Sequence, residues 1–125
     1  MMQTIRGFGE SLSHAWDGVR IAFRSERSFR LQIAASFAIL LAILLLPLER
    51  WEQVILLLAI AMVLVLELVN SMVERLVDLV KPRINSYVKE IKDLMAAAVL
   101  IAALFAAAIG IVILGPYAQI ALGRL

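Results

Sequence analysis

Three apolar stretches, separated by short polar connections, constrain this chain more than any other feature of its sequence. The first, residues 31–48, carries no charge and has about the minimum length of a transmembrane helix, which needs roughly 17–25 residues. The uncharged core of the second, residues 54–66, is too short to span, so its helix has to continue toward Val80. The third, residues 94–114, ends at Gly115-Pro116, where a helix stops readily. We therefore predict three transmembrane helices, over residues 31–48, 52–79 and 92–114.

The composition excludes an ordinary soluble domain. Hydrophobic residues make up 63% of the 125 residues, against roughly 45–50% in soluble domains, and one compact domain cannot hide that much apolar side chain from water. The same hydrophobicity excludes disorder. The chain has no cysteine and one histidine, which excludes disulfides, cysteine nucleophiles and multi-histidine metal sites. We expect a single membrane-embedded domain of the all-α class over residues 1–125.

The N-terminal segment follows a different pattern, in which apolar residues recur every three or four positions. These residues are Ile5, Phe8, Leu12, Trp16, Val19 and Phe23. On a helix they share an arc of roughly 80°, with charged residues around the other side. The pattern predicts an amphipathic helix over about residues 4–27 that lies in the membrane surface. The alternative is a helix that packs on a soluble partner.

The positions of lysine and arginine predict how the chain is oriented. Basic residues gather before the first span and in the second connection, whereas the first loop and the C-terminal tail have one each. They are Arg6, Arg20, Arg24, Arg27 and Arg30, then Lys81, Arg83, Lys89 and Lys92, then Arg50 and Arg124. Because loops rich in these residues stay in the cytoplasm, we expect the N-terminus and the second connection inside and the C-terminus outside.

One face of the second span is polar. Its residues are Glu67, Asn70, Glu74 and Asp78, which a helix places within roughly 80° of arc. An ionisable group inside a span costs at least ~2.5–3.5 kcal/mol on insertion scales, so it usually marks a functional site. Aligned carboxylates also repel one another, and Arg75, Lys92 or a divalent metal ion could offset the repulsion. The alternative is that the face only joins helices through hydrogen bonds.

The chemistry open to this face is narrowed by what the sequence lacks. It contains no glycine-rich loop and no Walker lysine motif. Magnesium does not need such a loop, since it binds through one or two carboxylates plus substrate phosphates. A carboxylate near the bilayer can also accept a proton from an alcohol. The face could therefore hold a magnesium nucleotide at its cytoplasmic end and a lipid hydroxyl deeper in.

Three parts of the sequence resemble a known family. One is the run Glu67-Leu-Val-Asn70-Ser71-Met-Val-Glu74 with Asp78 after it, and another is Lys92-Asp93-(x2)-Ala96-Ala97-Ala98. The third is the N-terminal stretch Ala15-Trp16-(x)-Gly18-(x7)-Glu26-(x2)-Phe29-Arg30. Together, over about residues 7–115, they are similar to the prokaryotic diacylglycerol kinase family of small membrane lipid kinases. That family includes the diacylglycerol kinases of Gram-negative bacteria and the undecaprenol kinases of Gram-positive ones.

The resemblance implies a homotrimer in the bacterial inner membrane, in which each protomer has a surface helix and three transmembrane helices. It also implies a kinase that uses ATP and Mg²⁺ at the cytoplasmic face to phosphorylate a lipid hydroxyl. By position, Glu67 is the catalytic base, and Glu26 and Glu74 bind the metal. The nucleotide-binding positions are His14, Glu26, Asn70, Glu74, Arg83, Asn85, Lys92 and Asp93. The lipid-substrate positions are Ser11, Trp16, Arg20, Phe29, Arg30, Glu67 and Ala96.

The function predicted on this basis is a lipid kinase that converts diacylglycerol to phosphatidic acid. An undecaprenol kinase with the same mechanism stays open as an alternative. Two alternatives come from other classes: a small proton-coupled transporter, which would also use a membrane glutamate, and a non-catalytic scaffold whose polar face only joins protomers. We expect ATP, a membrane lipid and further copies of the chain as partners, and no nucleic acid.

Overall fold

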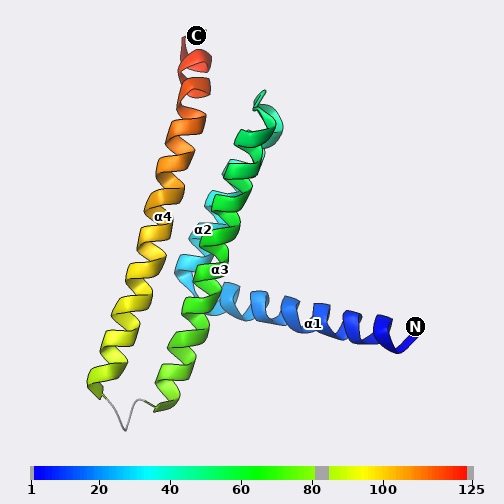
Figure 1. The fold of residues 1–125 in the computed structure, drawn as a ribbon, viewed down its shortest axis with the longest axis vertical. Helices are drawn as coiled ribbons and strands as arrows, with labels where there is room; N and C mark the ends of the chain where they lie inside the picture. Colours follow the sequence, from blue (N-terminus) through cyan, green and yellow to red (C-terminus); the bar gives the residue numbers. More distant parts are fainter. Residues whose placement is uncertain (1, 81–84, 124–125) are drawn as a thin grey trace.

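A computed structural model describes residues 2–80 and 85–123 of the chain. Over these residues it contains four helices and no strand: α1 (Met2–Ser25), α2 (Arg27–Leu45), α3 (Arg50–Val80) and α4 (Asn85–Leu122). Helices α2, α3 and α4 run alongside one another, whereas α1 leaves them at a steep angle (Figure 1). The predicted all-α class is confirmed.

Three of these helices are long and apolar enough to cross a membrane: α2, α3 and α4. By length and composition, this confirms the three predicted spans. The helix ends differ from the prediction, since α2 begins at Arg27 and α4 does not stop at Gly115-Pro116 but runs on to Leu122. Membrane helices tolerate an internal proline, because neighbouring groups satisfy the carbonyl that its missing N–H leaves free.

Helix α3 is the centre of the bundle, since it packs against both α2 and α4. The buried core lies where the α2–α3 turn meets the C-terminal part of α4, around Leu48, Leu56 and Ile113. Many other large apolar side chains are exposed, including Leu44 and Leu79 at 80% each. Apolar faces of this kind are covered by lipid or by other copies of the chain when the helices cross a membrane.

A polar contact ties the α2–α3 turn to α4 at the end of the bundle that carries the C-terminus (Figure 1). The Glu52 carboxylate accepts a hydrogen bond from the Tyr117 hydroxyl at 2.7 Å and another from the backbone N–H of Glu49 at 2.8 Å. Glu52 lies in the first turn of α3, so the second bond also caps the start of this helix. The Tyr117 bond holds the part of α4 beyond Pro116 against the turn.

Glu26 separates α1 from α2 and turns the chain. Its backbone is extended, with φ −108° and ψ 117°, and the residues on both sides are helical. Arg30 of α2 reaches back, and its Nη1 donates to the carbonyl oxygens of Phe23 at 2.9 Å and Arg24 at 3.3 Å. The last carbonyls of a helix lack partners within it, so Arg30 caps α1. The first helix therefore ends at Ser25, before the predicted residue 27, and α1 points away from the bundle (Figure 1).

Candidate active site

Glu67 is the most deeply buried carboxylate of the described residues, with 2% of the residue exposed. It lies on α3 beside the start of α2, where Ser28 donates a hydrogen bond from its Oγ to Oε2 of Glu67 at 2.9 Å. Among the described residues, no cation pairs with this carboxylate. Burying a carboxylate without a cation is costly, and inside a membrane such a residue usually serves a function.

Asn70 and Glu74 follow on the same side of α3. The Asn70 Nδ2 donates to Oε1 of Glu74 at 3.4 Å, and both residues are half-buried. Within the part of the chain that the structure describes, no lysine or arginine lies within ion-pair distance of Glu74. Among the described residues, therefore, no direct ion pair at Glu67 or Glu74 offsets the predicted repulsion along this face.

Of the two cations that the sequence offers to this face, Lys92 pairs with its last member and Arg75 pairs with a carboxylate outside it. Lys92 Nζ of α4 lies 2.9 Å from Oδ1 of Asp78, near the end of α3. Arg75 Nη2 of α3 lies 3.9 Å from Oε1 of Glu26 and donates to the Ser25 hydroxyl oxygen at 2.8 Å. All these side chains are partly exposed, and exposed ion pairs contribute only about 0–1 kcal/mol. They link α4 and the α1–α2 junction to α3 beside the polar face.

Glu26 and Glu74 retain oxygens that could hold a metal ion. The contacts described above use Oε1 of each residue, and among the described residues no hydrogen bond or ion pair uses Oε2. In residues 2–80 and 85–123, no three acidic or histidine side chains are close enough to enclose an ion. Magnesium does not need such a group, because phosphate oxygens and water complete its shell. Glu26 and Glu74 could therefore each offer one oxygen to an ion whose other ligands come from phosphate and water.

The predicted site residues of α1 lie apart from the carboxylates. They are Ser11, His14, Trp16 and Arg20, all of them exposed. The Ser11 hydroxyl donates to the Gly7 carbonyl of its own helix at 2.9 Å, and Trp16 is 64% exposed. The hydrogen bonds and ion pairs of the described residues join none of these four to α3 or α4. One chain therefore leaves their side chains open to lipid, nucleotide or another copy.

The other predicted positions fall on α2, α4 and the second connection. Phe29 is buried beside the α1–α2 junction, and Arg30 caps α1. Asp93 and Ala96 are exposed on α4. Two predicted nucleotide residues lie outside the described side chains: Arg83 and Asn85.

Two serines near Glu67 were not among the predicted site residues. Ser28 contacts Glu67 from another helix, and no sequence pattern signals a contact between residues 39 positions apart. Ser71 lies one turn after Glu67 and is 5% exposed, and its hydroxyl has no hydrogen-bond partner among the described residues. Its helical spacing from Glu67 is the signal that could have included it in the predicted site.

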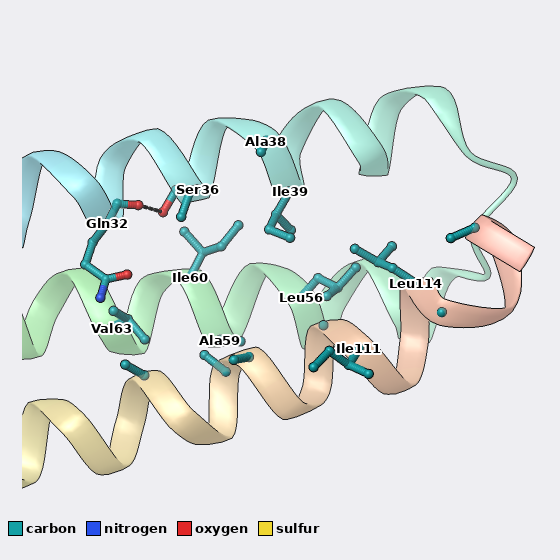
Figure 2. Close-up of a pocket in the computed structure, with 17 residues that line it drawn as sticks. Gln32, Ser36, Ala38, Ile39, Leu56, Ala59, Ile60, Val63, Ile111 and Leu114 are labelled. Carbon is teal, nitrogen blue, oxygen red and sulfur yellow. Dashed lines mark hydrogen bonds between the residues drawn. The ribbon is translucent and has the colours of Figure 1, made fainter. Parts of the chain in front are cut away.

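A hollow of about 570 Å³ lies between α2, α3 and α4. Its lining is largely apolar, with Ile39 of α2, Leu56 of α3 and Ile111 of α4 pointing toward it (Figure 2). Gln32 and Ser36 stand at one end, where the Ser36 hydroxyl donates to the Gln32 carbonyl of its own helix at 2.7 Å (Figure 2). The described residues that line the hollow include no charged side chain, so the hollow offers no carboxylate to a metal ion.

Comparison with known proteins identifies the family. Residues 13–114 match the family described as prokaryotic diacylglycerol kinase. The chain is 39% identical over 101 residues to a diacylglycerol kinase of Synechocystis sp., covering 80% of this chain and 58% of that protein. It is 35% identical over 109 residues to an undecaprenol kinase of Bacillus subtilis, covering 87% and 89%. It is 30% identical over 100 residues to a diacylglycerol kinase of Escherichia coli, covering 78% and 80%. The chain therefore belongs to the prokaryotic diacylglycerol kinase family, a family of membrane lipid kinases, as its motifs predicted.

Proposed function

We propose that the chain transfers the γ-phosphate of MgATP to the hydroxyl of diacylglycerol and forms phosphatidic acid at the cytoplasmic face of the inner membrane. The observation that carries this proposal is the buried Glu67 carboxylate, which has a hydroxyl donor on one oxygen and no cation among the described residues. A carboxylate so placed is suited to accept a proton from an alcohol. Family membership supports the phosphoryl transfer itself.

In the proposed reaction Glu67 is the general base. Its ionised carboxylate takes the proton of the lipid hydroxyl while the hydroxyl oxygen bonds to the γ-phosphorus and the bond from that phosphorus to the β–γ bridging oxygen breaks. The products are the lipid phosphate, ADP and a protonated Glu67, which then releases its proton to water. Phosphoryl transfer requires mainly positioning and neutralisation of charge, so a small set of side chains is sufficient.

The nucleotide is proposed to bind toward Glu74. Glu74 follows Glu67 by seven residues on α3, or about 10 Å of helix rise, which separates a lipid hydroxyl near the acyl region from phosphates near the headgroups. Glu26 and Glu74 would hold Mg²⁺, which neutralises phosphate charge when bound. Asn70 keeps Glu74 in place through its hydrogen bond. The nucleotide would be surrounded by the remaining predicted positions: His14, Arg83, Asn85, Lys92 and Asp93.

Helix α1 is proposed to lie in the cytoplasmic surface of the membrane. Its apolar residues Phe8, Leu12 and Trp16 are all exposed, and they would be covered by acyl chains in that position. The steep angle between α1 and the bundle (Figure 1) suits a helix in the membrane plane beside helices that cross it. The arginines around α1 support a cytoplasmic N-terminus. Such a helix would bring Ser11 and Arg20 to the lipid substrate.

The functional unit is proposed to be a homotrimer. One chain leaves large apolar side chains of all three spanning helices exposed, and the predicted site residues of its α1 do not contact the carboxylates. Transmembrane helices associate by close packing, so further copies would cover these faces and complete the site. The number three follows from the resemblance to the family.

An undecaprenol kinase with the same mechanism is the second candidate. The observation in its favour is the share of this chain that aligns with each relative. The Bacillus subtilis undecaprenol kinase aligns with 87% of this chain, whereas the two diacylglycerol kinases align with 80% and 78% of it. Both lipids offer an alcohol group, so the Glu67 carboxylate suits either as proton acceptor.

Radiolabelled ATP with Mg²⁺ and either lipid in detergent micelles tests these candidates. We expect label in phosphatidic acid with the unaltered chain and far less with Glu67→Gln. Label that enters undecaprenol faster than diacylglycerol would replace the first candidate by the second. No label in either lipid would contradict kinase activity and would favour a transporter or a scaffold.

A further inference from the structure

We propose that Ser28 is a positioning residue of the kinase reaction, which holds the Glu67 carboxylate with one oxygen available to the lipid hydroxyl. The inference rests on the proposed role of Glu67 as the base, but it concerns another residue on another helix. Ser28 stands at one of the two unspecified positions between Glu26 and Phe29 in the N-terminal motif. The motif therefore assigns it no role.

Ser28 reaches Glu67 across the contact between α2 and α3. It lies in the first turn of α2, and its Oγ is 2.9 Å from Oε2 of Glu67. Within residues 2–80 and 85–123, it is the one side chain that donates a hydrogen bond to this carboxylate. Glu67 is 2% exposed, whereas Ser28 is exposed in the single chain, so the bond joins a buried carboxylate to a hydroxyl at the edge of the contact between α2 and α3.

A helical serine has a local alternative to such a contact. Three other serines take it, each donating to the carbonyl four residues earlier in its own helix: Ser11, Ser25 and Ser36. Ser28 is the second residue of α2, so the carbonyl four residues before it belongs to Arg24 of α1, which accepts a bond from the Arg30 guanidinium. Ser28 therefore has no such carbonyl within its own helix, and its hydroxyl donates to Glu67 instead.

The bond defines which carboxylate oxygen does the chemistry. With Oε2 held by Ser28, the proton of the lipid hydroxyl goes to Oε1. The Ser28 O–H stays a donor to Oε2 before and after this transfer, so Ser28 neither gains nor loses a proton. Ser28 also lies two residues after Glu26, so the segment that carries a proposed metal ligand also positions the base.

Steady-state lipid phosphorylation by the full chain in micelles tests the proposal. We expect Ser28→Ala to lower kcat roughly tenfold or more, the rate equivalent of one hydrogen bond to a charged group, with the KM for ATP and the magnesium dependence unchanged. Ser28→Thr keeps the hydroxyl and should retain kcat within about threefold. Ser36→Ala is the matched control, because it removes a hydroxyl of the same helix that bonds only to its own backbone. Its kcat should equal that of the unaltered chain.

A double substitution separates positioning from a general structural effect. In the Glu67→Gln background, Ser28→Ala should lower the residual kcat no further, since the group that Ser28 positions no longer acts as a base. A full additional loss in that background, or an unchanged kcat in Ser28→Ala alone, would overturn the proposal. If Ser28→Ala does not fold, Ser28→Cys is used in its place, because the cysteine thiol is only a weak hydrogen-bond donor. A kcat of Ser28→Cys equal to that of Ser28→Thr would then overturn the proposal. Failure of the proposed function looks different, because Glu67→Gln would itself keep its turnover.

Discussion

Replacing Glu67 by glutamine removes the proposed base and little else. Glutamine has nearly the size of glutamate, and its amide oxygen can still accept the bond that Ser28 donates at 2.9 Å. Glu67 is 2% exposed, so bulk water is poorly placed to take the proton in its place. We expect kcat to fall roughly 100-fold or more, on the scale of general-base catalysis. Nucleotide binding should be largely retained, because the proposed nucleotide end lies further along α3.

Glu67→Asp keeps the charge but changes the geometry. Shortening the side chain by one methylene withdraws the carboxylate by about 1.5 Å. The 2.9 Å contact with Ser28 would then exceed hydrogen-bond length. A displacement of about 1 Å at a catalytic group can cost roughly 100-fold in rate, so aspartate should restore little of the activity.

Lipid phosphorylation and nucleotide binding are measured on the same micelles, with an unfolding curve to show that each variant is folded. The glutamine side chain carries no charge into the buried site, so Glu67→Gln should be at least as stable as the unaltered chain. If Glu67→Gln lost ATP binding but kept its turnover once nucleotide was bound, Glu67 would belong to the nucleotide site and would not be the base.

Three further predictions concern the metal, the far end of the bundle and the orientation of the chain. Glu26→Gln and Glu74→Gln should each reduce activity sharply and weaken its magnesium dependence, because the ion loses a charged ligand, and full activity in either variant would remove that residue from the metal site. Tyr117→Phe should lower the free energy of unfolding in micelles by about 1–3 kcal/mol, since the hydrogen bond from the Tyr117 hydroxyl to a buried carboxylate is lost. Under conditions where this variant stays folded, its kcat should equal that of the unaltered chain. A reporter fused after Leu125 should lie outside the cytoplasm, and one inserted near Ser86 should lie in the cytoplasm. The opposite orientation would contradict the proposed ATP site at the cytoplasmic face.

The unequal lengths of the helices explain where the proposed site lies. Helix α2 has 19 residues and α3 has 31, so α3 runs past the start of α2 and past the α1–α2 junction (Figure 1). Glu67 lies where α2 still covers α3. Glu74 and Asp78 lie on the part beyond it, where they are half-buried and exposed. The proposed base Glu67, which is buried, and the proposed metal ligand Glu74, which is more open, therefore lie on one helix that extends beyond its neighbour.

The sequence alone determined the class, the three spans and the shared polar face. An uncharged run inside a membrane can satisfy its backbone groups within its own segment only as a helix, so composition and length were sufficient for the spans. Glu67, Asn70 and Glu74 share a face because their spacing on one helix is a local property. The motifs around them were also sufficient to predict the family.

Only the tertiary structure decided which groups meet across helices and where two helices end. Ser28 meets Glu67 over 39 positions and Tyr117 meets Glu52 over 65. The end of α1 at Ser25 coincides with a cap from the following helix, and α4 continues past Pro116 where Tyr117 is bonded to α3. The periodicity of a single helix shows which side chains share a face. It does not show the depth at which a second helix packs against that face, and this depth decides which hydroxyl reaches which carboxylate.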